Sequence, residues 1–211
     1  MKNLCLAVFT LFVSSAFAQE KRAGATAKQP AVFVLTINDK EYSVTEGEAL
    51  KLDGNFSSPT VSIKAAPYAK FDNGKVSFKY KNNSTYDYSE SEGNRTWTFD
   101  GSDCVVFLFE LDALVKVDAI TDNVISQFGK KNCKTEPVTK KIGDKVLKGV
   151  RINVTLAGQK LVQEYYDLGL NDTRTNILAF QNLKKEDGSI AEEGLAAADM
   201  VATSFKVLQS H

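Results

Sequence analysis

Histidine and cysteine, which carry much of the nucleophilic and metal-binding chemistry of proteins, are rare in this chain of 211 residues. The single histidine is His211, the last residue, and the cysteines are Cys5, Cys104 and Cys133. A Ser-His-Asp or Cys-His centre needs an imidazole beside the nucleophile, and zinc sites use imidazoles or closely spaced thiolates. The residues therefore argue against both kinds of site.

Carboxylates are the remaining groups from which a catalytic centre could be built. Two carboxylates that face each other across a cleft can hydrolyse a glycosidic bond, and Asp100, Asp103, Glu110 and Glu164 are available for such a pair. The chain has 26 acidic residues, however, so their availability proves little. It contains no nucleophile elbow, zincin, P-loop or dinucleotide motif. We expect a protein without enzyme activity, metal or cofactor, with a carboxylate-based hydrolase as the alternative.

Cys104 and Cys133 are the two cysteines that remain after removal of an export signal described below. An even pair in an oxidising compartment predicts one disulfide, which would stabilise the fold by about 3.5 kcal/mol in the chain-entropy account. Two buried, unpaired thiols are the alternative. The separation of the two residues is too long for a redox C-x-x-C motif or a zinc knuckle.

Aromatic residues on either side of a polar stretch are the first candidates for partner binding. Tyr86 and Tyr88 lie in a polar context, where a ring could stack on a sugar or anchor a partner. Trp97 and Phe99, two positions apart, are typical of the inner face of a strand. The same explanation is open for the two tyrosines.

Basic residues concentrate between positions 130 and 160, although the chain has equal numbers of basic and acidic residues. This segment predicts a basic hairpin face for an acidic polymer or another protein, with these candidate contacts: Lys140, Lys141, Lys145, Lys148 and Arg151. A solvated outer face, where lysines deter edge pairing, explains the same pattern. The zero net charge gives no reason to expect nucleic acid as a partner.

The first 18 residues have the three parts of a secretory signal. Lys2 provides the positive charge, residues 4–13 form an apolar stretch, and Ala16 and Ala18 complete an A-x-A cleavage site. The apolar stretch is too short to span a bilayer. We expect cleavage after Ala18, no transmembrane anchor, and a secreted or periplasmic protein.

Six Asn-x-Ser/Thr sequons occur in the chain. In a eukaryotic secretory pathway some would be glycosylated, whereas in a bacterium they indicate only polar loops. The candidates for glycosylation are Asn55, Asn82, Asn83, Asn94 and Asn171, and the sixth sequon begins at Asn153.

Hydrophobic periodicity predicts the elements that position these residues. Residues 19–30 contain no large apolar side chain and predict a disordered leader. Alternation at Val61, Ile63 and Ala65 predicts a half-buried strand, and further strands follow. Helical spacing appears over 114–128, and a second helix is predicted to open at a Ser189–Glu192 capping box. We expect a single α+β domain over 31–208, with an antiparallel sheet covered by helices.

The segment 71–208 resembles the PsbP-like superfamily, which includes the extrinsic photosystem II protein PsbP and a Ran-binding nuclear-import factor. The resemblance is carried by the strand at 76–80, the passage from strand to helix over 105–129, the hairpin at Gly143-Asp144, and the closing helix that leads into 203–207. It implies an α/β/α sandwich, to which residues 31–70 would add an N-terminal strand extension.

By analogy, the resemblance implies an exported accessory or binding protein without catalytic activity. A secreted carbohydrate-directed enzyme or sugar-binding module is one alternative, and a structural component of the envelope or surface is another. The sequence does not identify the ligand or partner.

Overall fold

The computed structural model describes residues 30–102, 104–170 and 173–208. Of these residues, 53% lie in strands and 16% in helices. The predicted signal peptide (1–18), the leader up to residue 29, Asp103, Asn171 and His211 lie outside the described residues. Within the described ranges no helix is long and apolar enough to cross a membrane.

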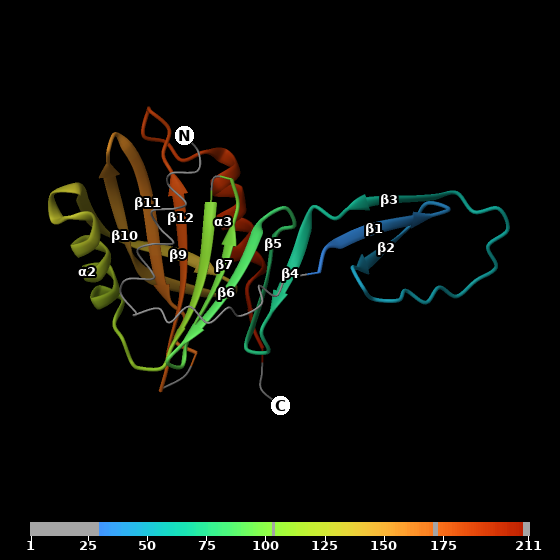
Figure 1. Ribbon diagram of the computed structural model, residues 1–211, viewed down its shortest axis with the longest axis horizontal. Helices are drawn as coiled ribbons and strands as arrows, with labels where there is room; N and C mark the ends of the chain where they lie inside the picture. Colours follow the sequence, from blue (N-terminus) through green and yellow to red (C-terminus); the bar gives the residue numbers. More distant parts are fainter. Residues whose placement is uncertain (1–29, 103, 171–172, 209–211) are drawn as a thin grey trace.

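A seven-stranded antiparallel sheet, which we call the main sheet, forms the centre of the molecule in the order β6-β7-β8-β12-β11-β10-β9 (Figure 1). Tight turns with positive φ join neighbours, at Glu92-Gly93 between β6 and β7 and at Ala157-Gly158 between β10 and β11. Such turns match the twist of an antiparallel pair. The strands are β6 (Thr85–Ser91), β7 (Asn94–Asp100), β8 (Cys104–Leu111), β9 (Cys133–Ile142), β10 (Lys145–Leu156), β11 (Gln159–Asp167) and β12 (Thr175–Leu183).

One face of the main sheet is covered by α2 (Val117–Phe128). The helix contacts β10 and β11, and it ends at Gly129, where a positive φ of 85° turns the chain into the short 3₁₀ helix η1 (Lys130–Asn132). Phe128 packs there against buried sheet residues that include Phe107, Ile152, Tyr165 and Ile177.

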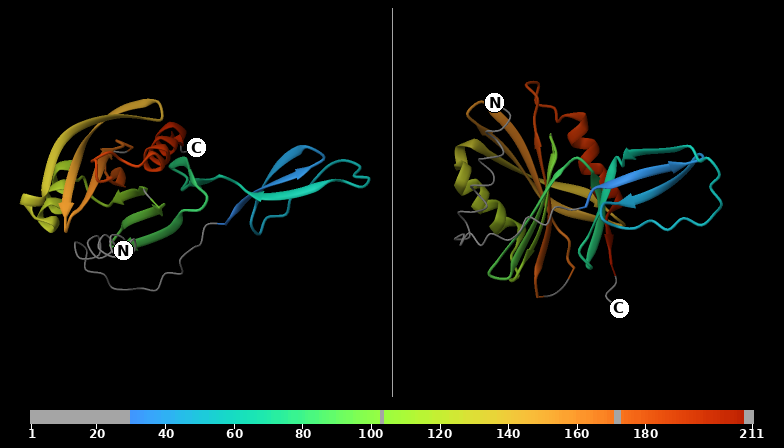
Figure 2. Two further views of the ribbon diagram at one scale, coloured as in Figure 1. Left: turned by 90° about the horizontal axis from the view of Figure 1, so that it is seen from above. Right: turned by 45° about the vertical axis from the view of Figure 1, so that its right-hand side comes forward.

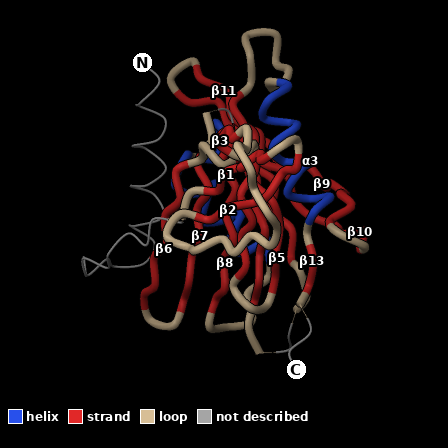
Figure 3. The backbone as a smooth tube through the Cα atoms, turned by 90° about the vertical axis from the view of Figure 1, so that its right-hand side faces the viewer, coloured by secondary structure: helices blue, strands red, loops and turns tan. Residues whose placement is uncertain are grey.

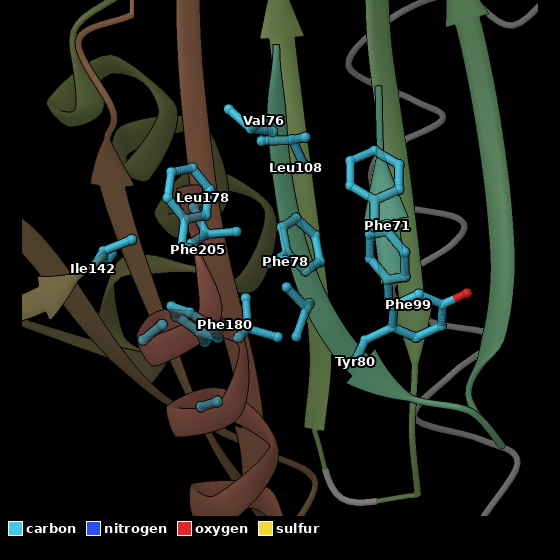
Figure 4. Packing of buried hydrophobic residues seen from close by; sticks show 14 of the residues in the cluster. Phe71, Val76, Phe78, Tyr80, Phe99, Leu108, Ile142, Leu178, Phe180 and Phe205 are labelled. Carbon is cyan, nitrogen blue, oxygen red and sulfur yellow. The ribbon is translucent and has the colours of Figure 1, made fainter. Parts of the chain in front are cut away.

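The opposite face carries α3 (Glu192–Ser204) and a second sheet in the order β13-β5-β4 (Figure 2). The strands of this second sheet are β4 (Tyr68–Asp72), β5 (Val76–Lys81) and β13 (Lys206–Val207). Phe71, Phe78 and Phe99 meet between the two sheets, with ring centroids 5.0–5.2 Å apart (Figure 4). This aromatic cluster holds the second sheet against the main sheet.

A third sheet projects away from this body (Figure 1). It consists of β1 (Val32–Ile37), β2 (Lys40–Thr45) and β3 (Val61–Ala65) in the order β2-β1-β3, with antiparallel pairs. Asn38 and Asp39 take positive φ in the turn between β1 and β2. We call these three strands the projecting sheet.

The predicted α+β fold is wrong, because the chain is mainly β with three antiparallel sheets and only two α-helices among the described residues. Each α-helix covers part of one face of the main sheet. The second sheet covers much of the face of the main sheet that we expected a helix to cover. Residues 32–65 form a further, separate sheet. The predicted boundary at residue 70 also falls inside β4, which pairs with β5.

Both predicted helices are present, but the second begins differently from the prediction. No side chain caps α3, whose N-cap residue is Ala191. The Ser189 hydroxyl instead donates to Asp187 Oδ1 at 2.7 Å in the preceding turn. A hydrogen bond within that turn therefore takes the place of the predicted capping box.

Candidate functional site

The projecting sheet has one apolar face. The register of its strands and the alternation of side chains place apolar residues side by side on all three strands. Lys40 is the only charged residue of the three strands on this face. The apolar members are Phe33, Leu35, Ile37, Tyr42, Val44, Val61, Ile63 and Ala65.

The other face of the projecting sheet is largely polar. Lys64 Nζ on β3 forms an ion pair with Glu41 Oε1 on β2 at 3.0 Å, across the intervening β1. Both side chains are exposed, so the pair adds little stability. A sheet with one apolar and one polar face usually packs its apolar face against a second layer.

Among the residues that the structure describes, no second layer covers the apolar face along β3. All five residues of this strand are exposed, and Val61 and Ile63 retain 56% and 63% of their accessible surface. Ile37 on β1, in contrast, is buried. Figure 3, viewed from the end of the projecting sheet, shows β1, β2 and β3 in front of the body. The exposed apolar surface therefore lies at the β3 side.

The two edges of the projecting sheet differ in the backbone groups that they present. Ala66 N–H donates to Val32 O and Asn38 N–H donates to Thr60 O, so the even-numbered residues of β3 face β1. The N–H and C=O groups of Val61, Ile63 and Ala65 point away from the sheet, because these groups alternate along a strand.

The β2 edge presents polar residues at the equivalent positions. Glu46 N–H donates to Ala31 O, so the backbone N–H and C=O groups of the even-numbered residues of β2 face β1. The outward groups then belong to Glu41, Ser43 and Thr45. An edge with apolar side chains at its outward positions is the one that favours strand pairing, because charge on an edge deters it. The β3 edge is therefore the candidate functional site.

Asn82 fastens the base of the projecting sheet to the body. Its side-chain amide donates to Val32 O at 2.8 Å and to Ala66 O at 3.0 Å, and so bridges β1 and the end of β3. The Asn82 backbone N–H also donates to Pro67 O. A pocket of ≈ 400 Å³ lies beside this junction, between β2 and β4, and its lining includes Thr45 and Tyr68.

The main sheet contains an ionic cluster centred on Glu110, whose side chain is 2% exposed, whereas its cationic partners are partly exposed. Glu110 Oε2 accepts from Lys75 Nζ at 2.8 Å, and Oε1 accepts from Arg174 Nη1 at 2.8 Å and from Arg95 Nη1 at 3.5 Å. Glu90 pairs with Arg95 as well, at 3.1 Å. The cluster links β8, β7, the start of β5 and the start of β12 around one carboxylate.

The pKa of Glu110 reflects opposing effects. Burial raises it, whereas the hydrogen bonds from Lys75 and Arg174 and the positive charges of Lys75 and Arg95 lower it, with a net result below its ordinary value of 4.5. The carboxylate is thus ionised, and its oxygens accept hydrogen bonds from lysine and arginine side chains. This arrangement is that of a structural ion network rather than of a general acid, which needs a raised pKa.

The other candidate carboxylates are not arranged as a pair. Asp100 lies on the face of the main sheet that carries α2, whereas Glu110 and Glu164 lie on the α3 face. Strand spacings place the latter two about 16 Å apart, and Glu164 accepts hydrogen bonds from Arg151 and Tyr166. Asp103 is outside the described residues. The described residues also contain no group of three side chains that could hold a metal ion.

The candidate tyrosines lie on the edge strand β6 and pack against the core. Tyr86 is half-buried against Phe99, at 5.5 Å between ring centroids. Tyr88 packs on Trp97 at 5.4 Å, and its hydroxyl donates to Glu90 Oε2. Burial and this hydrogen bond raise the pKa of Tyr88 to about 12.

The candidate basic residues do not form one surface. Lys140 and Lys145 lie on the α3 face of the β9–β10 hairpin, whereas Lys141 and Lys148 lie on the other face. Lys140 pairs with Asp199 on α3 at 2.9 Å and is already occupied. Arg151 is occupied as well, by Glu164 at 2.6 Å and Glu136 at 3.1 Å.

The predicted disulfide is absent, because both Cys104 and Cys133 are free thiols in the structure. Cys104 packs in the core on the α3 face, and Cys133 packs on the α2 face. Their strands β8 and β9 are separated by β12, β11 and β10, which is about 19 Å at ordinary strand spacing. A disulfide needs Cα atoms within roughly 7 Å.

The sequons differ in what their side chains do. Asn55 and Asn83 are exposed. The amide nitrogen of Asn82 donates to Val32 O and Ala66 O, an arrangement that we call the Asn82 clamp. A glycan on this nitrogen would displace at least one of the two hydrogen bonds. Asn94 accepts from Asp112 N–H through Oδ1. Asn153 contacts Glu136 and Lys184.

Comparison of the sequence with protein-family models finds no match, and no curated protein matches it significantly. The resemblance to the PsbP-like superfamily therefore stays a prediction. The function has to be inferred from the geometry alone.

The β3 edge was missed as a site because its sequence signal is ambiguous. Alternation at Val61, Ile63 and Ala65 predicted a half-buried strand, yet all three are exposed. The pattern identifies an apolar face correctly, but it does not say what covers that face. The flanking Pro59 and Pro67 were the available signal for an edge strand.

Proposed function

We propose that this chain is an exported accessory protein that binds another protein chain by strand addition to β3. The observation that carries the proposal is an edge strand with outward backbone groups and exposed apolar residues at Val61 and Ile63. Strand addition uses both features, since the backbone gives affinity and alternate side chains give specificity. The Asn82 clamp supports it by fixing the base of the projecting sheet to the body.

Capture of binding partners from the native compartment tests this proposal when it compares variants. The mature wild-type chain is immobilised beside Ile63→Lys, which places a charge on the β3 edge, and Ser43→Lys, which places one on the β2 edge. Both positions are exposed, so neither change should alter stability by more than about 0.5 kcal/mol. We expect wild type and Ser43→Lys to retain the same identified partner and Ile63→Lys to lose it. Equal capture by all three chains would contradict the proposal.

A further inference from the structure

The β3 edge has an almost symmetric sequence. The outward residues of β3 are Val61, Ile63 and Ala65, and Pro59 and Pro67 lie two positions beyond them in the sequence. Ile63 is the centre, with one small or medium apolar residue and then one proline on each side. Proline has no N–H to donate, so the two prolines close the row of outward donors at both ends.

We propose that the partner of β3 is the β3 strand of a second copy of this chain, paired antiparallel with Ile63 opposite Ile63. This inference rests on the proposed function and names its partner. In this register Val61 of one copy lies opposite Ala65 of the other. All three outward residues then form hydrogen-bonded pairs, each of which exchanges two N–H to O=C bonds.

Other registers leave outward backbone groups of β3 without a partner. A shift by one residue sets outward groups of one strand against inward groups of the other. A shift by two residues places a proline opposite Val61 or Ala65, where the N–H needed for a full pair is missing. The register with Ile63 opposite Ile63 is therefore favoured, and, like every antiparallel pair of identical strands, it has the two-fold symmetry of a homodimer interface.

The side chains agree with the same register. On the apolar face, Val61, Ile63 and Ala65 of both copies would lie side by side and join the apolar faces of the two projecting sheets into one surface. On the polar face, Ser62 lies opposite Lys64 of the other copy, and Lys64 is already paired with Glu41. No like charges are directly opposite, which would destabilise the pair.

The interface is short, so we expect a reversible dimer. Five residues per strand bury less area than the roughly 1,200 Å² that separates weak complexes from stable ones. Association should therefore depend on protein concentration.

Site-directed disulfide formation in the full mature chain tests both the contact and its register. Hydrogen-bonded antiparallel pairs have Cα atoms about 5.5 Å apart, within reach of a disulfide. We expect Ile63→Cys to give a covalent dimer under mild oxidation. Val61→Cys and Ala65→Cys should each fail alone, because like positions lie about 13 Å apart along the strand, and an equimolar mixture of the two should cross-link. Ser43→Cys on the β2 edge is the matched control, and wild type reports any contribution of Cys104 and Cys133.

Sedimentation equilibrium of wild type and Ile63→Lys completes the test. We expect the wild type to dimerise reversibly and Ile63→Lys to stay monomeric. A monomeric wild type, a dimer that persists in Ile63→Lys, or strong cross-linking by Val61→Cys alone would overturn the inference. If the wild type is monomeric but Ile63→Lys still loses a captured partner, a strand of a different protein occupies β3 and only the self-pairing is wrong. If Ile63→Lys also captures normally, the proposed function fails as well.

Discussion

At the scale of single residues, the carboxylate of Glu110 joins β8 to β7 and to the segments that lead into β5 and β12. It lies on the interior strand β8 and accepts hydrogen bonds from cationic side chains 15, 35 and 64 positions away in sequence. A buried charge is tolerated only when it is paired and hydrogen-bonded in this way. The bonds of the Glu110 carboxylate are therefore satisfied within the fold.

Replacement of Glu110 by glutamine should destabilise the protein by about 2–3 kcal/mol, because charge-assisted hydrogen bonds are lost while Lys75, Arg95 and Arg174 remain. The pKa of Glu110 is lower in the folded state than its ordinary value of 4.5. Its contribution to stability is therefore complete above that value and disappears as the pH falls through the lowered folded value. Urea unfolding at pH values from 7 to 3 measures the free energy of unfolding of both proteins. The Glu110→Gln variant should lose less of it on acidification than wild type. An equal loss in both proteins would contradict the assignment.

The two cysteines give a second prediction at this scale. Burial raises the pKa of Cys104 to about 12 and also raises that of Cys133, which is half-buried. Because the thiolate is the reactive form, Cys104 should resist alkylation in the native protein at pH 8, and Cys133 should react slowly. Mass spectrometry of the non-reduced protein should show two free thiols, and reductant should leave the Tm unchanged. A fall in Tm on addition of reductant would contradict this and would support the predicted disulfide between Cys104 and Cys133.

Asn82 provides the last prediction at the residue scale. Asn82→Ala removes two hydrogen bonds between the body and the base of the projecting sheet, at a cost of about 1–2 kcal/mol. We expect amides of β1 and β3 to exchange about tenfold faster while the main sheet is unaffected. Asn83→Ala, at the neighbouring exposed residue, is the control. Equal exchange rates in both variants would show that Asn82 does not hold the projecting sheet.

At the scale of elements, the main sheet depends on close approach between β10 and β11. A Cβ atom at Gly149 would overlap the backbone oxygen of Tyr165 and lie 2.7 Å from a ring carbon of Tyr166. The backbone oxygen cannot move without breaking the register of the two strands. Gly149→Ala should therefore lower the free energy of unfolding by at least about 2 kcal/mol, whereas Gly158→Ala, which has open space around it but a positive φ, should cost about 1 kcal/mol. Denaturant midpoints compare the two, and a smaller cost at Gly149 would contradict the packing.

Periodicity predicted these elements better than their arrangement. Helical spacing identified α2 and α3, and alternation identified β3 and β5, because both patterns follow from local geometry. Pairing across the sheets was not readable in the same way. Cys104 and Cys133 begin β8 and β9, which follow each other as strands along the chain but are separated by three strands in the sheet. The Glu110 cluster was missed for the same reason.

At the scale of the whole molecule, the chain divides into a body with two cores and one projecting sheet (Figure 1). Composition and periodicity could not separate these parts, because an apolar strand that faces a core and one that faces solvent have the same sequence pattern. The difference is set by which layers the topology brings together. The α+β expectation failed at this level, since the second sheet occupies space assigned to helices.

The central claim is that the outward backbone groups of β3 are open in the monomer and are the groups that a partner strand covers. Residue-resolved amide hydrogen exchange of the full chain tests it most directly, in dilute solution and at rising concentration. In dilute solution the amides of Val61, Ile63 and Ala65 should exchange rapidly, whereas those of Ser62 and Lys64, which face β1, should be protected. At high concentration all five should become protected, and Ile63→Lys should abolish the change. Protection of Val61, Ile63 and Ala65 at every concentration would show that the chain covers its own edge and would contradict the account.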